Sequence, residues 1–359
     1  MISYHIIGVM SGTSTDGLDI AFVLFEFDEN KKLWTHNLLH SKMYDYPTDL
    51  SQKLKHAKEI NGLSLKRLDN ELGRFIGETI NQFINEQKID RSTIDAIASH
   101  GHTIFHLPNE KLTLQIGNGQ FIASTTKIRT ITNFREKDVV YGGQGAPLVP
   151  IGDLLLFASY AQSFLNLGGF ANITHISGNQ ILAYDICPCN LPLNKYATLI
   201  GYPYDHNGEL GKSISYHNEG LVKTLNNLPF YAKSHPKSLG AEWFENNFSP
   251  LLDIDELTAQ EKLKICYDHI SEQISLNINK LGAKDVLITG GGAKNKYLIE
   301  CIQAKTSVNI IIPDTLVIDF KEAIVFGFLG ALHLANQPNC LREVTGAYQD
   351  SISGNVYYP

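Results

Sequence analysis

The stretch Gly8–Val23, GVMSGTSTDGLDIAFV, decides the fold of this chain. It combines an apolar strand, a turn of small and polar residues, and a second apolar strand. Backbone N–H groups and hydroxyls in such a turn can approach an anion closely. We interpret the hairpin as a cradle for the phosphates of a nucleotide; an ordinary hairpin with a polar tip is the alternative. The candidate phosphate-binding residues are Gly12, Thr13, Ser14, Thr15, Asp16, Gly17 and Asp19.

Two further glycine-rich turns follow strand-like runs, one within Ser163–Ser177 and one within Asp285–Glu300. Neither matches the P-loop or the G-x-G-x-x-G pattern. Either turn alone suits a structural role as well as a ligand loop, and the asparagines beside the first could simply stabilise a turn. Three such turns at strand ends together favour a nucleotide site. Their candidate residues are Asn166, Gly168, Gly169, Asn172, Gly290, Gly291, Gly292 and Asn295.

Composition narrows the class of protein. The 359 residues are 43% hydrophobic and 19% charged, which is typical of a globular protein with a full core. The net charge is −7 and no Lys/Arg-rich run is present, so we expect neither a nucleic-acid partner nor a membrane partner. No apolar run approaches a membrane span, and the N-terminus lacks the pattern of a secretory signal. We therefore expect a cytoplasmic protein.

Metal-binding patterns are sparse. Asp16 and Asp19 could hold a Mg²⁺ ion that is bound to phosphates, because Mg²⁺ prefers carboxylate and phosphate oxygens. Cys187 and Cys189 form a C-P-C unit, but a metal site would need two more ligands, and no second Cys/His pair is obvious. The odd total of five cysteines argues against a disulfide framework and for a reducing compartment.

The order of the elements indicates an α/β protein with a duplicated layout. A hairpin with a polar tip opens the chain, and a similar hairpin opens a second half near Ser163. In that half we expect strands at Ser163–Leu167, Ile173–Ser177 and Gln180–Tyr184. Two such halves facing each other would place a nucleotide in the cleft between them. We expect one domain of residues 1–130 plus 338–359 and a second of residues 131–337, with a hinge within Arg135–Pro150.

Helical periodicity is clearest in three segments, Leu63–Glu86, Leu257–Lys280 and Phe320–Ala335. The third has Asp319 as a candidate N-cap and Glu322 three residues later, which resembles a capping box. A cap and nothing more is therefore one interpretation of Glu322.

Motifs along the whole chain resemble the anhydro-N-acetylmuramic acid kinase family, which belongs to the actin/hexokinase-type (ribonuclease H-like) sugar kinase superfamily. The family signature M-S-G-T-S-x-D-G-x-D is similar to Met10–Asp19. Further matching segments are Ser99–Thr103, Leu114–Gly117, Phe134–Pro150, Leu165–Thr174, Gly290–Asn295 and Val344–Ala347.

The resemblance implies a two-domain kinase that uses ATP and Mg²⁺. The family opens the anhydro bridge of 1,6-anhydro-N-acetylmuramic acid, a recycled cell-wall sugar, with water and phosphorylates O6. The match implies Asp185 as the base that accepts the proton of water, and Glu322 as a second active-site residue. It also implies contacts with the sugar at His100, Gln115, Arg135, Asp138 and Asn190. The family tends towards homodimers.

The base motif departs from the family pattern. The family sequence D-T-G-P-G-N reads Asp185–Asn190, DICPCN, so both glycines are cysteines and the threonine is isoleucine. A cysteine disfavours positive φ where glycine would permit it. In the later pattern K-S-x-G-R-E, an arginine that could bind a carboxylate is replaced by Ala241.

Three functions stay open at this point: a kinase for the family substrate, a kinase for a related sugar, and a nucleotide-binding protein without chemistry. Asp185 could also be a structural carboxylate that caps the next helix. His100 and His102 suit either contact with sugar or phosphate, or a supporting role in polar packing.

Overall fold

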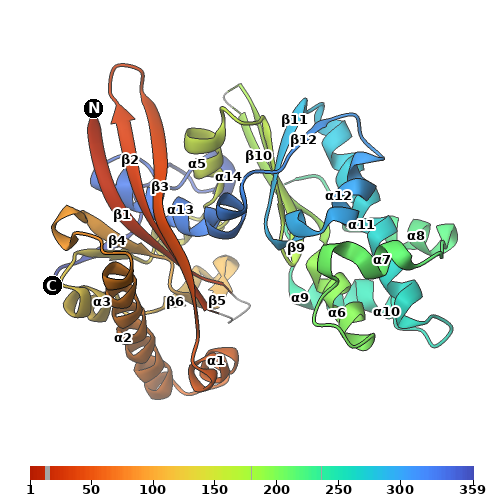
Figure 1. Cartoon of the computed structure of the whole chain (residues 1–359), viewed down its shortest axis with the longest axis horizontal. Coiled ribbons are helices and arrows are strands. Elements are labelled where there is room, and N and C mark those ends of the chain that lie inside the picture. The colour runs from red at the N-terminus through yellow and green to blue at the C-terminus, as the bar shows by residue number, and fades with distance from the viewer. Residues whose placement is uncertain (13–16, 179, 236) are drawn as a thin grey trace. The chain divides into compact units, whose positions relative to one another are not determined.

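The computed structural model describes residues 1–12, 17–178, 180–235 and 237–359. The chain forms two compact units: Met1–Phe157 with Phe320–Pro359, and Ala158–Asp319. Figure 1 shows a β-sheet with flanking helices in each. From the sequence we expected domain boundaries at 130/131 and 337/338, whereas the two compact units of the structure meet at 157/158 and 319/320. The segment after residue 130 belongs to the first unit because β7 (Thr130–Thr132) pairs with β4 (Ala96–Ser99) of its sheet.

The first unit contains a six-stranded sheet with the order β13-β7-β4-β1-β2-β3. Its remaining strands are β1 (Ile2–Ser11), β2 (Gly17–Asp28), β3 (Leu33–Asp45) and β13 (Asn355–Tyr357), and β5 (His102–Leu107) and β6 (Leu112–Ile116) form a separate hairpin. Its helices are α1 (Thr48–Lys55), α2 (Gly62–Glu86), α3 (Gly119–Thr126), α4 (Glu136–Val140), α5 (Pro150–Gly152), α14 (Arg342–Thr345) and most of α13 (Thr315–Leu334).

The second unit contains a five-stranded sheet with the order β10-β9-β8-β11-β12. These strands are β8 (Ser163–Leu167), β9 (Phe170–Ser177), β10 (Gln180–Pro188), β11 (Asp285–Thr289) and β12 (Asn309–Ile311). Its helices are α6 (Asn190–Leu199), α7 (Glu209–Ser213), α8 (Glu219–Asn226), α9 (Ala241–Trp243), α10 (Ser249–Leu252), α11 (Ala259–Leu281) and α12 (Lys296–Gln303).

The two sheets repeat one topology. In each, the opening strand (β1 or β8) pairs antiparallel with the next strand, which pairs antiparallel with a third. On its other side, the opening strand pairs parallel with β4 or β11, which in turn pairs parallel with β7 or β12. The predicted duplicated α/β fold of the actin/hexokinase type is thereby confirmed.

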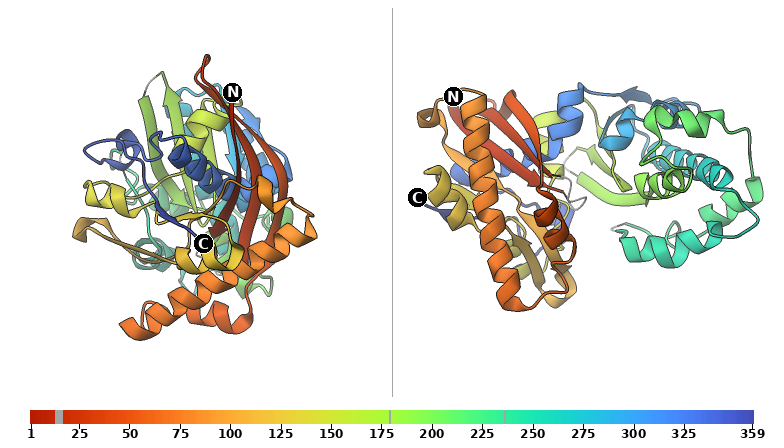
Figure 2. Two further views of the ribbon diagram at one scale, coloured as in Figure 1. Left: turned by 90° about the vertical axis from the view of Figure 1, so that its left-hand side faces the viewer. Right: turned by 60° about the horizontal axis from the view of Figure 1, so that its bottom comes forward.

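Helices cover both faces of the first sheet. The long helix α2, which crosses one face in Figure 2, buries Leu72, Ile76 and Ile80 completely against it. Helix α13 packs on the other face, where a Cβ at Gly8 would lie 2.0 Å from the Ala323 carbonyl oxygen. Only glycine permits β1 and α13 to approach this closely.

Helix α13 begins five residues before its predicted start. Its N-terminus is at Thr315, where the N–H groups of Val317 and Ile318 donate to the carbonyl of Asp314. Asp319 therefore lies inside the helix and forms an ion pair with Lys294, at 2.5 Å. The predicted capping box at Asp319 and Glu322 is wrong, because hydrogen bonding extends the helix beyond the apolar repeat.

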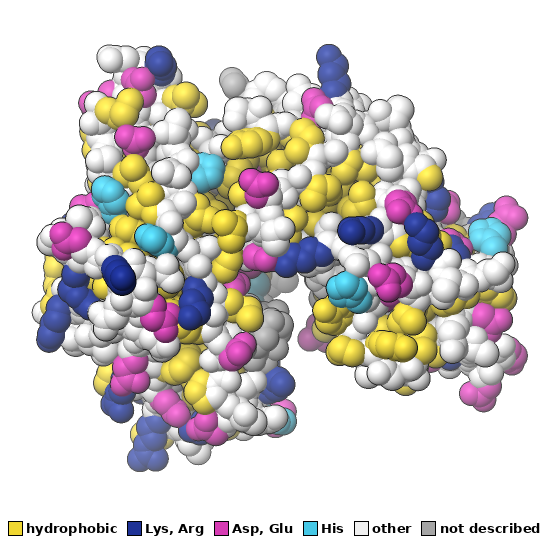
Figure 3. Space-filling model, viewed as in Figure 1, with side chains coloured by type: hydrophobic (Ala, Val, Ile, Leu, Met, Phe, Trp, Pro, Cys, Tyr) yellow, Lys and Arg dark blue, Asp and Glu magenta, His cyan; other side chains and the backbone are white. Residues whose placement is uncertain are grey.

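No helix within the described residues is long and apolar enough to cross a membrane. On the face drawn in Figure 3, Lys/Arg and Asp/Glu side chains are interspersed over the surface rather than gathered by sign.

Candidate functional site

A row of polar residues crosses the sheet of the second unit. In the strand register, Asp185 on β10 is opposite Asn172 on β9, which is opposite Asn166 on β8, which is opposite Thr289 on β11. Residues opposite each other share a face of a sheet. Three predicted site residues from three strands therefore lie on one face, while Leu165, Ala171 and other alternate residues pack into the core behind it.

The two glycine-rich turns of this unit meet at one end of that row. Gly290 adopts φ +81°, and a Cβ there would lie 2.6 Å from Oδ1 of Asn166. A Cβ at Gly292 would lie 2.7 Å from that of Leu167. The backbone of Gly168 and Gly169 follows directly and accepts hydrogen bonds from the first residues of α6. Side chains are thus excluded where Gly290 and Gly292 approach the end of β8, so glycine backbone lines this end of the row.

Asn190 joins these turns. Its Nδ2 donates to the Leu167 carbonyl at 3.0 Å, and the same side chain lies 3.1 Å from the Cβ position of Gly292. Asn190 was predicted to contact the sugar, and the structure places it in the cradle of the two turns.

Asn295 is fixed by its own element. Its Oδ1 accepts from the Leu298 N–H and so caps α12, while its Nδ2 donates to the Tyr267 hydroxyl at 2.7 Å. That hydroxyl donates to the buried Asp205 carboxylate, which also accepts from the backbone N–H groups of Leu210 and Gly211 in the first turn of α7. These contacts hold the end of the third glycine-rich turn rigidly.

Asp185 lies inside β10, at a β-bulge between Asp185 and Cys187. The prediction that the strand ends at Tyr184 is wrong, because β10 is an edge strand, where a proline is tolerated, and pairing continues to Pro188. The helix-cap interpretation of Asp185 is also wrong, since the residue before α6 is Cys189 and no side chain caps that helix. Burial raises the pKa of Asp185 to about 6, against a hydrogen bond from the Leu239 N–H that lowers it.

The two cysteines of the altered motif are completely buried. Cys187 is opposite Ala171 in the register, so it faces the core rather than the polar row. Cys189 has φ −127°, and neither cysteine adopts positive φ. Burial raises the pKa of both thiols, so they are neutral packing groups.

In the first unit, the stem of the opening hairpin is anchored by side chains. The Tyr46 hydroxyl donates to Ser11 Oγ at 2.7 Å, and Ser11 Oγ is 3.0 Å from Nδ1 of His102. Gly12 follows Ser11, and Gly17 and Asp19 begin β2, with Asp19 half-buried opposite Met10. Thr13, Ser14, Thr15 and Asp16 lie outside the described residues.

Arg135 is held by hydrogen bonds to His100 and to the loop that follows α4. Its Nε donates to Nε2 of His100 at 2.9 Å, and a terminal nitrogen donates to the Gly145 carbonyl at 2.7 Å. Nδ1 of His100 donates to the Gly101 carbonyl, and burial together with the Arg135 charge keeps the pKa of His100 well below 6.5. His100 is therefore a neutral acceptor that orients the guanidinium. Burial raises the pKa of Glu322, against the charges of Arg135 and Lys321, which lower it.

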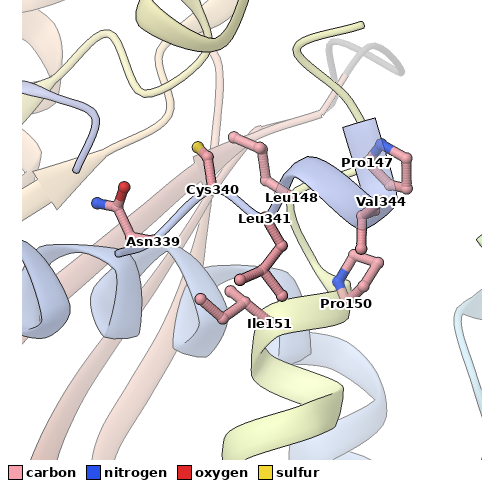
Figure 4. A pocket seen from close by; sticks show the side chains of 8 residues that line it. All are labelled: Pro147, Leu148, Pro150, Ile151, Asn339, Cys340, Leu341 and Val344. Atoms are coloured by element: carbon pink, nitrogen blue, oxygen red, sulfur yellow. The ribbon is translucent and has the colours of Figure 1, made fainter. Parts of the chain in front are cut away.

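Asp138 is completely buried and serves the loop that follows it. Its carboxylate accepts from the Gly145 N–H and from the Thr345 hydroxyl, each at 2.7 Å. Both oxygens are thus used within the protein. The segment Arg135–Pro150, predicted as a hinge, instead lies inside the first unit, and its end packs against residues 339–344 around a small apolar recess (Figure 4).

Gln115 belongs to the β5–β6 hairpin. Its Nε2 donates to Thr113 at 2.9 Å, and its Oε1 is buried without a hydrogen-bond partner among the described residues. Thr289 at the end of the polar row, which the sequence analysis missed, also has a buried hydroxyl without a described partner. An unpaired buried polar atom is uncommon and marks a position for water or ligand. The sequence offered one signal for Thr289, which is that it directly precedes the glycine-rich turn at Gly290.

The comparisons with known proteins cover the full length. The family model "Anhydro-N-acetylmuramic acid kinase" matches residues 4–359. Relatives with that name share 34% identity in Sulfurovum sp. (strain NBC37-1) and 33% in Vibrio vulnificus (strain CMCP6); the alignments cover 98% of this chain in both cases and 98% and 97% of the relatives.

Two solved structures are similar at 10% identity. One is component A of the Acidaminococcus fermentans (R)-2-hydroxyglutaryl-CoA dehydratase, with a TM-score of 0.47 over 90% of this chain and 95% of that chain. The other is a ROK family glucokinase from Streptomyces griseus in complex with glucose and AMPPNP, with a TM-score of 0.41 over 90% and 98%. The family model and the curated relatives decide the assignment: the chain belongs to the anhydro-N-acetylmuramic acid kinase family.

Proposed function

We propose that the chain is an ATP-dependent kinase that opens 1,6-anhydro-N-acetylmuramic acid with water and phosphorylates O6, giving N-acetylmuramic acid 6-phosphate. The observation that carries this proposal is the half-buried carboxyl of Asp185, on one sheet face with Asn172 and Asn166. A pKa of about 6 leaves Asp185 mostly ionised at neutral pH yet able to accept a proton.

In this mechanism, Asp185 accepts a proton from the water that attacks C1 of the sugar. The bond between the water oxygen and C1 forms while the bond between C1 and O6 breaks. O6 then bonds to the γ-phosphorus as the bond to the bridging oxygen of ADP breaks. Arg135, whose Nε donates to His100, is the cation proposed to bind negative charge on the substrate, and Glu322 is proposed as a second catalytic carboxylate.

The residues present suit the phosphates and adenosine of ATP. Backbone groups of the turns at Gly168–Gly169 and Gly290–Gly292, with Asn166, Asn172 and Asn295 beside them, would hold the nucleotide. The opening hairpin would cradle phosphates, and the Asp19 carboxylate is of the type that suits Mg²⁺, which would neutralise phosphate charge. Asn190 and Gln115 are the polar side chains proposed to contact the sugar. The contacts of Asp138 favour a supporting role.

A related sugar is the second candidate substrate. Ala241 stands where the family pattern has arginine, and a neutral residue there removes one possible partner for a carboxylate. The free state of all five cysteines supports a reducing compartment such as the cytoplasm.

The test is a coupled ADP-release assay at saturating Mg·ATP, with and without the anhydrosugar. We expect sugar-dependent turnover in the wild type and its loss in Asp185→Asn, with ATP affinity retained in calorimetry. Asp255→Asn, an exposed aspartate of the same unit, is the matched control. Turnover of Asp185→Asn near the wild-type rate would remove Asp185 as the base. Turnover only with a sugar lacking the lactyl group would favour the second substrate.

A further inference from the structure

One side of the edge strand β10 is flanked by a short backbone segment at Asp185. β10 is the last strand on its side of the sheet, and its inner side pairs with β9. On the outer side, the Asp185 N–H donates to the Lys237 carbonyl at 3.1 Å, and the Leu239 N–H donates to Asp185 Oδ2 at 2.8 Å. Lys237 thus holds the main chain of Asp185, and Leu239, two residues further on, holds its side chain.

The second carboxylate oxygen of Asp185 has a different environment. Oδ1 makes no hydrogen bond within the described part of the chain, and Asp185 is half-buried rather than enclosed. A carboxylate whose Oδ2 is fixed in this way keeps Oδ1 in one orientation. That oxygen is left to accept a proton from a water molecule.

Within the described part of the chain, no cation forms an ion pair with Asp185. On its own strand the titratable neighbours are Tyr184 and the buried thiol of Cys187, and β9 presents the neutral Asn172. On the flanking segment, the His235 ring stacks on Tyr184, with 5.6 Å between the ring centroids. Nζ of Lys237 lies 4.7 Å from the ring centroid of Phe230 and 5.8 Å from that of Tyr184. From α11, Lys280 acts on Lys237 rather than on Asp185. The Leu239 N–H is therefore the described donor that reaches this carboxylate.

We propose that the backbone of Lys237–Leu239 positions Asp185: its hydrogen bonds orient the carboxylate and determine the lowest pH at which Asp185 can act as the base. The inference rests on the proposed function of Asp185. It assigns the K-S-L-G segment a role that its main chain performs, independent of the side chain at 239. A donor to the ionised carboxylate favours the charged form, so its loss must raise the pKa.

The experiment compares Leu239→Pro, which removes the N–H, with Leu239→Ala, which keeps it. Ser238→Pro is the control for the proline ring, since no described hydrogen bond uses the Ser238 N–H. Sugar-dependent kcat/KM is measured from pH 5 to pH 8. For Leu239→Pro we expect the acid limb to move up by about one pH unit. Activity would then be about ninefold below that of Leu239→Ala at pH 5 and within about 10% of it at pH 8.

A second measurement covers a Leu239→Pro chain that fails to fold. Hydrogen exchange of the Leu239 amide is followed in the wild type and in Asp185→Ala, and we expect faster exchange by at least about tenfold in the variant. Equal exchange, or an acid limb that Leu239→Pro leaves in place, overturns the inference. Retained turnover in Asp185→Asn instead refutes the proposed base, so the two failures are distinguishable.

Discussion

Substitution of Asp138 can distinguish two roles for this residue, contact with the sugar and stabilisation of the loop after α4. Asp138→Ala leaves the Gly145 N–H without its acceptor, and it removes the partner of the Thr345 hydroxyl. Hydrogen bonds to a charged group contribute about 1.5–3 kcal/mol each. Because the Thr345 hydroxyl can turn to the Leu341 carbonyl at 3.2 Å, we take the lower value for each bond, about 3 kcal/mol in total.

Each unit contains one tryptophan, whose fluorescence reports the thermal unfolding transition of that unit. Trp34 is 4% exposed in the first unit, and Trp243 lies in the second. The first unit has about 200 residues, and a domain of that size loses about 2–4 °C in Tm for each kcal/mol. In a Trp243→Phe background, we expect Asp138→Ala to lower the Trp34 transition by about 6–12 °C. In a Trp34→Phe background, the Trp243 transition should move less.

Asp138→Asn is the matched control. Its amide can accept from Gly145 with the oxygen and donate to the Thr345 oxygen with the nitrogen, so we expect most of the stability to return. A sugar contact through the charge of Asp138 would behave differently, with a raised KM for the sugar in Asp138→Asn and an unchanged Trp34 transition in Asp138→Ala. That result would refute the reasoning.

Three further predictions follow from buried contacts. Burial lowers the pKa of His269 to about 3, so the unfolded state binds a proton that the folded state excludes between pH 6.5 and 3. Between pH 7 and pH 5, urea unfolding should show about 2 kcal/mol more loss in the wild type than in His269→Gln; parallel losses would count against this. His100→Leu removes the acceptor of Arg135 and should lower kcat/KM by about 10–100-fold, with partial recovery in His100→Gln, whereas equal losses would deny the orienting role. Gly292→Ala places a Cβ 2.7 Å from that of Leu167 and should cost about 1–3 kcal/mol in thermal unfolding, while unchanged stability would show that the turn adapts.

Local sequence predicted the central strands better than the edge strands. The strand Ser163–Leu167 has its predicted bounds, because Phe164, Leu165 and Leu167 are buried apolar residues and a glycine pair follows them directly. The long edge strand Leu33–Asp45 was missed, since its sequence is mostly polar and much of it is exposed. It forms because its backbone pairs with β2 along the whole length. Pairing of that kind depends on the partner, which a local pattern does not contain.

The site could be predicted as a set of turns but not as a set of contacts. The glycines at positions 290 and 292 are recognisable because each backbone approach excludes a side chain. The pair Asp138 and Thr345 is 207 residues apart in the sequence, and the pair Arg135 and His100 is 35 apart. Their residue types alone suit substrate binding as well as support. Only the geometry shows that both carboxylate oxygens of Asp138 accept hydrogen bonds from within the protein.

The altered base motif is explained by the bulge in β10. Without the bulge, Asp185 and Cys187 would share a face, because side chains alternate along a strand. The shift in register places Asp185 opposite Asn172 and Cys187 opposite Ala171, on opposite faces. The thiol therefore enters the core, where a glycine would leave space that another group must fill. The departure from the family pattern changes packing behind the sheet and leaves the carboxylate and its Leu239 donor in place, which is why an active base is compatible with cysteines at these positions.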